Sequence, residues 1–369
     1  MLFYFFVFAV IAILALLSHG KSSRDQKILS IISAIIIVCF QGFRWRTGTD
    51  WEPYLNAFLR PEANREDYEI GHYIFNKAIR LFTGSYTVFL FIQCSIVAIC
   101  QLKVADYFKV KNGSLVMLMS FVTTPFPIRY TMAVSIFLLS YKYIVENKLI
   151  KFIICTLIAA SIHQIVIVAL PFYFITRRIY STKILFVVYL SCCMVGLMTE
   201  LVFTSFRDGM NMVIQLLPEF SQYKLNYYMD EMEAERTLSS IIISYVNGAV
   251  FIYLFTKLRY LRYKDDAKYN VLLNLYVFGL AFGRVAITAL PYLSRAIACF
   301  SGGFILMSIL GINALHMKSK NNTTIIQSFT LFGFIIYMFM IYHRQLVYYY
   351  PVFVPYFSIF SSSTRTVIF

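Results

Sequence analysis

Residues 28–51 decide the fold class: the apolar run ILSIISAIIIVCFQGF at 28–43 is followed directly by Arg44-Trp45-Arg46-Thr47-Gly48-Thr49-Asp50-Trp51. An apolar run of this kind is typical of a membrane helix, and tryptophan favours the headgroup region where such a helix leaves the bilayer. An anchoring girdle explains the two tryptophans. It does not explain Asp50, or a Gly48 turn that folds the carboxylate back toward the arginines. Because ionisable groups near hydrocarbon are costly, we interpret this stretch as part of a functional site.

The composition predicts an all-α polytopic membrane protein. Hydrophobic residues make up 59% of the chain and charged residues 14%, against about 25% charged residues in soluble domains. Apolar runs long enough to cross a bilayer recur from end to end. They are too long and too uniformly apolar for the alternating strands of a barrel, so a helical bundle remains.

The net charge of +15 reflects topology rather than nucleic-acid binding. Twenty of the 33 Lys and Arg lie in short clusters between apolar runs, as the positive-inside rule predicts for cytoplasmic loops. Twelve of the 18 acids lie in two other connections, residues 44–85 and 205–238. We therefore expect these two to be the outer loops, and we expect no nucleic-acid partner.

The runs predict about 11–12 transmembrane helices in a single integral membrane domain, residues 1–369. The first is expected at 2–17, an interfacial helix at 73–83, and the last helices at 296–315 and 325–342. A final apolar segment, 345–361, follows. One stretch, 152–175, conflicts with the positive-inside rule if it crosses once, because Arg177 and Arg178 would then lie outside. A re-entrant pair of half-helices that meet near His163 makes every basic cluster cytoplasmic, and we prefer it.

Four ionisable residues lie inside or at the outer end of apolar runs without a topological reason: Arg129, His163, Arg284 and Arg295. Snorkelling arginines and a hydrogen-bonded core histidine are the simpler explanations. Together, however, the four point toward the side of Arg44, Arg46 and Asp50, which predicts a shared cavity. Several arginines suit phosphate oxygens, and a membrane-embedded polyanion suggests a polyprenyl diphosphate. His163 could accept a proton from an attacking hydroxyl, and so could Asp50 or Glu69.

Motifs for nucleotide binding or metal catalysis are absent from the sequence, which has no Walker loop, GxGxxG, HExxH or GxSxG. The seven cysteines lie in apolar runs without metal-ligand spacing. We predict neither a metal nor a cofactor.

The pattern Gly42-Phe43-Arg44-x-x-x-Gly48-Thr49-Asp50-Trp51-x-x-Tyr54 resembles the EpsG-like branch of the Wzy polysaccharide polymerases. Three further stretches share this resemblance: Glu69-x-Gly71, Arg129-Tyr130-x-x-Ala133, and Ser161-Ile162-His163-Gln164 before Leu170-Pro171. In the order and spacing of these motifs, the resemblance covers residues 1–175 well. The second half is similar only in hydropathy, in Arg284 and Arg295, and in a late Tyr- and Pro-rich segment.

The resemblance implies a metal-independent membrane glycosyltransferase with a GT-C-like bundle, in the bacterial inner membrane, whose active site faces the periplasm or exterior. Such enzymes transfer a growing glycan from undecaprenyl diphosphate to a hydroxyl of an incoming undecaprenyl-diphosphate-linked repeat unit. We assign the diphosphate to Arg129, Arg284 and Arg295, assisted by Arg44 or Arg46. His163 is the expected base, with Asp50 second. The expected sugar-binding residues are Glu69, Tyr54, Tyr130 and Trp51.

Two alternatives remain open at this stage. An O-antigen ligase uses the same donor but usually carries a larger outer loop. A flippase or transporter for lipid-linked oligosaccharides would line a path through both leaflets with charge, whereas the unexplained charges here are confined to the outer half. Expected partners are the lipid-linked glycans and the bilayer, with a chain-length regulator as an optional third.

Overall fold

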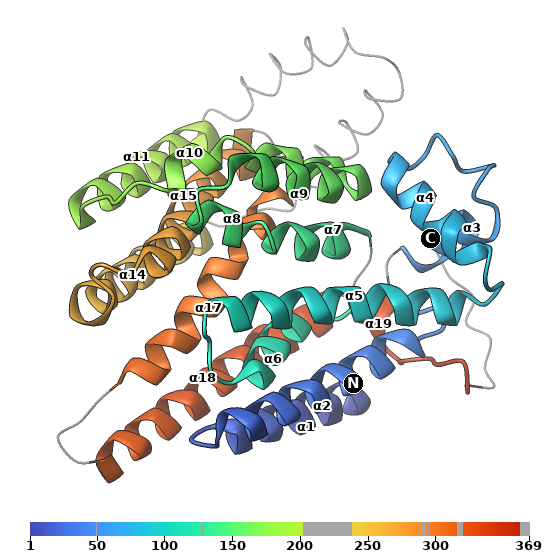
Figure 1. The fold of residues 1–369 in the computed structure, drawn as a ribbon, viewed down its shortest axis with the longest axis horizontal. Coiled ribbons are helices and arrows are strands. Elements are labelled where there is room, and N and C mark those ends of the chain that lie inside the picture. The colour runs from blue at the N-terminus through green and yellow to red at the C-terminus, as the bar shows by residue number, and fades with distance from the viewer. Residues whose placement is uncertain are drawn as a thin grey trace, which may run out of the picture. The chain divides into compact units, whose positions relative to one another are not determined.

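The computed structural model describes residues 1–48, 50–126, 129–201, 238–289, 293, 295–315 and 320–361 (Figure 1). Within these residues every regular element is a helix, and β pairing is limited to one bridge between Arg44 and Ser358. The predicted all-α polytopic architecture is confirmed. The predicted second outer loop, 205–238, lies outside the described residues except for Leu238, where α14 begins.

The chain divides into two compact units. Unit 1 comprises Met1–Tyr143, Ile150–Val166 and Ser308–Phe369, and unit 2 comprises Ile144–Leu149 and Ile167–Met307. The helices up to the middle of the chain are α1 (Leu2–Ser18), α2 (Ser23–Gly42), α3 (Trp51–Leu59), α4 (Ile70–Arg80), α5 (Tyr86–Tyr107), α6 (Gly113–Thr123), α7 (Arg129–Leu138), α8 (Tyr141–Val145) and α9 (Leu149–Ile162). They are followed by η1 (Gln164–Ala169), α10 (Phe172–Thr176), α11 (Thr182–Leu201), α14 (Leu238–Arg262), α15 (Ala267–Ala289), η2 (Arg295–Ile297), α17 (Ala298–Ala314), α18 (Lys320–Tyr348) and α19 (Tyr350–Phe353).

Seven helices of the described residues are long and apolar enough to cross a membrane, and three shorter apolar helices, α1, α6 and α9, accompany them. Several of the long helices carry apolar side chains on their surface. Only 17% of the apolar 18-residue stretch of α14, and 17% of that of α18, is buried inside the protein. The buried share is 72% for α15. Exposed Ile, Phe and Val on α14 and α18 are what lipid-facing helices require. The chain is therefore a multi-pass membrane protein.

In unit 1, α2 packs against α1, α5 and α6, and α18 packs against α1 and α6. Local sequence fixes where these helices begin. The Ser22 hydroxyl accepts the Asp25 amide and caps α2, and Asn112 caps α6 by accepting the Leu115 amide. In unit 2, the buried α15 is surrounded by α10, α11, α14 and η2.

The predicted first outer loop, 44–85, is the stretch between α2 and α5, and it contains α3 and α4. The interfacial helix expected at 73–83 is α4, which begins three residues earlier and ends at Arg80. Helix α3 was not predicted. It is held by an apolar cluster that joins Trp51 and Phe58 of α3, Ile79 of α4, and Tyr86, Phe89 and Leu90 of α5. The stretch is thus a packed layer rather than an open loop.

The expected final segment, 345–361, is not a helix of its own. Helix α18 continues to Tyr348, the short α19 ends at Phe353, and the chain then runs extended along residues 43–48. The Trp45 amide donates to the Phe357 carbonyl at 2.9 Å and the Ile359 amide to the Phe43 carbonyl at 3.0 Å. This C-terminal strap, residues 354–361, satisfies backbone groups of the Arg44–Trp51 stretch.

The segment 152–175 breaks where the sequence predicted. Helix α9 ends at Ile162, directly before His163, and the backbone continues as the 3₁₀ helix η1. Beyond α10, the Arg177 Nε donates to the Asn147 side-chain oxygen at 2.7 Å, so the residues that flank this segment meet each other. Such a return to its starting point is what a re-entrant pair requires. The re-entrant topology of this segment and the GT-C-like arrangement of the bundle stay predictions.

Candidate active site

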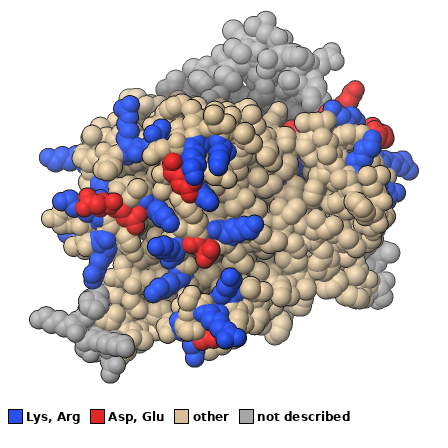
Figure 2. Space-filling model, in the orientation of Figure 1, with Lys and Arg blue, Asp and Glu red and all other residues tan. Residues whose placement is uncertain are grey.

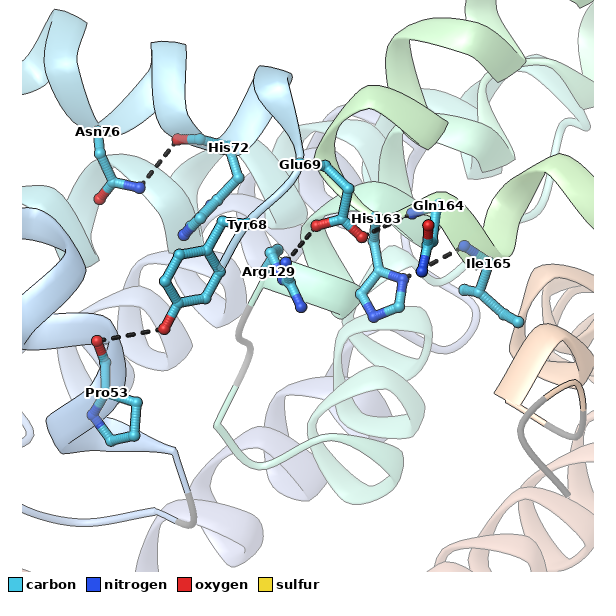
Figure 3. Close-up of polar contacts among 9 residues, drawn as sticks. All are labelled: Pro53, Tyr68, Glu69, His72, Asn76, Arg129, His163, Gln164 and Ile165. Atoms are coloured by element: carbon cyan, nitrogen blue, oxygen red, sulfur yellow. Dashed lines mark hydrogen bonds and ion pairs between the residues drawn. The ribbon is translucent and has the colours of Figure 1, made fainter. Parts of the chain in front are cut away.

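Glu69 joins the beginnings of three helical elements (Figure 3). It precedes α4, but its side chain does not cap that helix. One carboxylate oxygen pairs with Nη1 of Arg129, the first residue of α7. The other accepts the backbone amide of Gln164, the first residue of η1, at 3.0 Å. Because the side chains of Glu69 and Arg129 are only 17% and 16% exposed, this ion pair is shielded from water and is stronger than a surface pair.

Gly71 allows α4 to reach the end of α9. A Cβ at this position would lie 2.2 Å from the Ser161 hydroxyl oxygen and 2.7 Å from the Ser161 carbonyl oxygen. Any side chain would push the two helices apart, because a backbone atom cannot move aside cheaply. The Glu69-x-Gly71 pattern therefore has a physical reason: the carboxylate reaches Gln164 only because the glycine permits close contact two residues later.

A cluster of aromatic and imidazole rings lies beside Arg129. The Arg129 guanidinium carbon lies 4.9 Å from the centre of the Tyr68 ring, and the His72 ring lies 5.2 Å from Tyr68 and 5.7 Å from Tyr54. Burial raises the pKa of Tyr54 to about 12. Burial, and then the neighbouring charges of Arg129 and His163, lower the pKa of His72 to about 3. At neutral pH the cluster therefore offers a phenol and a neutral imidazole beside a cation.

Several buried polar atoms here have no hydrogen-bond partner among the described residues. They are Nδ1 and Nε2 of His72, Oδ1 of Asn76, Nε1 of Trp51 and Nε of Arg129. His72 is 1% and Asn76 2% exposed. Buried polar groups normally find partners, and an unmade hydrogen bond costs about 1–3 kcal/mol. Those of Arg129, His72 and Asn76 mark a place that a polar ligand or ordered water would complete.

His163 lies on the other side of Arg129 from Tyr68 and His72, as Figure 3 shows. It is 6% exposed, and its ring packs edge-on against Tyr130 at 5.3 Å between ring centres. Its Nδ1 accepts the Ile165 amide at 3.4 Å. This contact is long for a hydrogen bond, so it gives only a weak preference for the neutral tautomer with hydrogen on Nε2. The predicted sugar ligand Tyr130 and the predicted base thus touch each other.

Asp50 ends the turn that Gly48 opens. Gly48 has φ +113°, a conformation that favours glycine, and Asp50 stands at the beginning of α3 without capping it through its side chain. The charge of Asp50 is among the influences that raise the pKa of Tyr54 and of Tyr68. Asp50 therefore lies close enough to Tyr54 and Tyr68 for its charge to act on them, and its predicted approach to the arginines stays a prediction.

Arg44 is buried rather than open to a cavity. It is 2% exposed, and its guanidinium carbon lies 5.1 Å from the centre of the Phe126 ring, with the C-terminal strap across its backbone. Trp51 is 3% exposed and packs edge-on against Trp45 and Tyr86. Arg44 could contact a diphosphate, and Trp51 a sugar, only if the residues that cover them moved aside. Arg46 has φ +46° and continues the same turn.

Arg284 and Arg295 belong to unit 2. The Arg284 guanidinium donates to the hydroxyl and to the carbonyl of Ser244, at 2.7 and 2.8 Å, and lies over the Tyr245 ring at 4.9 Å. These contacts hold α15 against α14. Arg295 is the exposed first residue of η2. The convergence of these two arginines with Arg129 on one cavity stays a prediction.

The model of the EpsG family matches residues 27–358. That is most of the chain. The chain belongs to the EpsG family. No curated protein and no solved structure matches it. As a member of the EpsG family with several membrane-spanning helices, it is a polysaccharide-related membrane protein.

The EpsG-family match includes every site residue that the sequence singled out, on both sides of residue 175. The sequence placed Glu69 and Arg129 in the site but did not foresee that they pair, and it missed His72 and Asn76. Their spacing of four residues on one helix is the signal that could have found them, because it puts both side chains on one face. In this EpsG-family protein, no three His, Cys, Asp or Glu side chains of the described residues gather as metal ligands would.

Proposed function

We propose that this protein polymerises lipid-linked oligosaccharide repeat units. It transfers the growing glycan from undecaprenyl diphosphate to a hydroxyl of an incoming lipid-linked unit, on the outer side of the bacterial cytoplasmic membrane. The observation that carries the proposal is the shielded Arg129–Glu69 pair beside unsatisfied polar atoms of His72 and Asn76. EpsG-family membership supports the same substrate class.

The reaction needs one bond made and one broken at the anomeric carbon. The acceptor hydroxyl oxygen attacks that carbon, and the bond from carbon to the diphosphate oxygen breaks with its electron pair. The leaving diphosphate gains negative charge, which a guanidinium stabilises more in the transition state than before it. Arg129 still has an unpartnered Nε–H for this purpose while Nη1 is held by Glu69. Glu69 thus positions Arg129.

The proton of the attacking hydroxyl must pass to a base. His163 lies one residue before Gln164, whose backbone amide Glu69 binds. Glu69 therefore positions both the proposed base, His163, and the residue proposed to bind the diphosphate, Arg129. Asp50 is the second candidate. Tyr54 and Tyr68, both with raised pKa values, remain protonated. The Tyr54 hydroxyl can donate to a sugar oxygen, and the Tyr68 ring, whose hydroxyl donates to the Pro53 carbonyl at 3.3 Å, can stack on a sugar face.

The test uses purified full-length protein, a lipid-diphosphate-linked repeat unit and no nucleotide sugar. Wild type should yield a ladder of longer glycans. Arg129→Gln should reduce the rate of ladder formation by about 10²–10³-fold, the usual effect of removing a charge-stabilising donor. His163→Ala should abolish the ladder. Arg60→Gln, an exposed arginine of the same layer, is the matched control and should keep it.

Other outcomes separate the alternatives. A ladder that survives both substitutions keeps the polymerase and removes this site. Transfer of the glycan only to a lipid A core acceptor would indicate a ligase. If no ladder forms while the lipid-linked unit crosses a vesicle bilayer, the polymerase is wrong and a flippase replaces it.

A further inference from the structure

A lysine-lined pocket lies at the opposite end of α2 and α5 from the candidate active site. Its walls are the first turns of α2, the last turns of α5 and the connection into α6, all within unit 1. Its cavity volume is about 450 Å³, within the usual range for ligand sites. The side chains that the argument uses are Lys27, Ile31, Leu102, Lys103, Lys109 and Lys111.

The pocket is strongly positive. Four lysines and a single carboxylate, Asp106, line it. None of the four lysines forms an ion pair with a carboxylate of the described residues. Figure 2 shows Lys and Arg side chains gathered on the side where, in Figure 1, the turn between α1 and α2 and the end of α5 lie. Helices α2 and α6 begin at this pocket and α5 ends there, so the positive ends of two helix dipoles are partly offset by the negative end of a third.

The frame that carries the lysines is rigidly built. Asn112, between Lys111 and α6, has φ +72° and is 4% exposed. Its side-chain oxygen accepts the Leu115 amide, and its side-chain nitrogen donates to the Ala15 carbonyl at 2.8 Å. A Cβ on Gly113 would lie 2.5 Å from the Ser30 hydroxyl oxygen, so α6 begins in direct contact with α2. The hollow is thus held open by packing and not by the charged side chains themselves.

The positive-inside rule explains why lysines occur here but not why they line a hollow. A loop that only sets topology requires neither an enclosed volume, nor two helices that begin at it, nor a buried asparagine that fixes its backbone. The wall also carries hydrocarbon, because Ile31 is 45% exposed and Leu102 lies beside it in the lining. A concave site with positive groups at one end and apolar groups along one wall fits an amphipathic anion.

We propose that this pocket, at the face predicted to be cytoplasmic, binds the phosphate group of an anionic ligand. Two sources carry the same chemistry: the headgroup of an anionic phospholipid, whose acyl chains would follow Ile31, and a soluble phosphate or diphosphate. The site is separate from the proposed glycosyl transfer and does not depend on it.

The test measures ligand retention on full-length protein by native mass spectrometry, with phosphatidylglycerol, phosphatidylcholine and inorganic pyrophosphate as separate probes. The variant replaces Lys27, Lys103, Lys109 and Lys111 by Gln. The matched control replaces four exposed lysines of other basic clusters by Gln: Lys151, Lys183, Lys257 and Lys264. Both variants lose the same charge, so a general effect on topology or lipid attraction is common to both.

Wild type and control should retain phosphatidylglycerol or pyrophosphate at least about tenfold more tightly than the pocket variant, since each lysine near an anionic surface contributes about fivefold. Loss confined to phosphatidylglycerol assigns a lipid headgroup, and loss confined to pyrophosphate assigns a soluble phosphate. Equal retention of both anions in the pocket variant and the control overturns the proposal. Equal binding of phosphatidylcholine and phosphatidylglycerol by wild type, with no pyrophosphate bound, overturns it as well.

Discussion

At the scale of single residues, Arg129 and its neighbours show how a charge is kept inside a membrane protein. Glu69 neutralises it, Tyr68 covers it, and the backbone amide of Gln164 fixes the carboxylate. Replacing one member leaves the other charge buried and unpaired, which costs more than the pair contributes. The site is therefore ordered before any ligand binds, as catalysis by fixed charges requires.

His72 should make the stability of the protein depend on pH. Its pKa in the folded protein is about 3 instead of 6.5, so between these values the unfolded chain binds a proton that the folded chain does not. Stability is then lost as pH falls below about 6.5. Between pH 7 and pH 5 the loss from this group should be about 2 kcal/mol.

Thermal unfolding in detergent at several pH values measures this effect. His72→Phe, which keeps a ring among Tyr54 and Tyr68, should flatten the pH dependence. His343→Phe removes an exposed histidine on α18 and should leave it unchanged. An unaltered pH dependence in His72→Phe would show that His72 is protonated in the folded protein near its ordinary pKa.

At the scale of elements, the contact between α4 and α9 positions the site. Gly71→Ala places a methyl group within 2.7 Å of the Ser161 carbonyl oxygen, and such overpacking typically costs about 1–3 kcal/mol. We expect a lower unfolding temperature and a loss of glycan ladder. Gly333→Ala is the control, because nothing lies within 4 Å of a Cβ there and alanine favours a helix. A Gly71→Ala protein as stable and active as wild type would remove this contact from the account.

The break at His163 gives a second prediction for an element. Because Arg177 bonds to Asn147, both flanks of the segment 152–175 should lie on one side of the membrane. Cysteines introduced at 147 and 177, in a chain whose native cysteines are replaced by Ser, should react with an impermeant maleimide from the cytoplasmic side. A cysteine at Arg60 should react from the outer side. Labelling of 147 and 177 from opposite sides would mean that the segment crosses the membrane.

The sequence predicted single elements better than contacts between distant ones. The apolar runs at 2–17 and 296–315 located α1 and α17 to within a few residues, because each helix must bury or expose its own apolar length. Helix α3 escaped notice because its stability comes from Phe58 and Trp51 packed on α5, a tertiary effect. The burial of Arg44 escaped notice because it depends on a strap more than 300 residues away, and no local pattern encodes such pairing.

At the scale of the whole molecule, the EpsG-family chain combines lipid-facing helices with one packed layer, residues 44–85, and a lysine-lined pocket at the other end of α2 and α5. The layer offers a cation, neutral hydrogen-bonding groups and aromatic faces, which are the groups that a diphosphate and a sugar require. The proposed transfer uses Arg129 and His163, and the convergence of Arg284 and Arg295 on the same site stays a prediction.

The most direct test of this account measures how many molecules of lipid diphosphate are released for each glycosidic bond formed. Purified protein is supplied with a lipid-diphosphate-linked repeat unit, and released lipid diphosphate and glycan length are measured over the same time course. The account predicts one lipid diphosphate released for each bond formed, with both rates falling together in Arg129→Gln. Glycan growth without release of lipid diphosphate, or release without growth in the presence of acceptor, would contradict it.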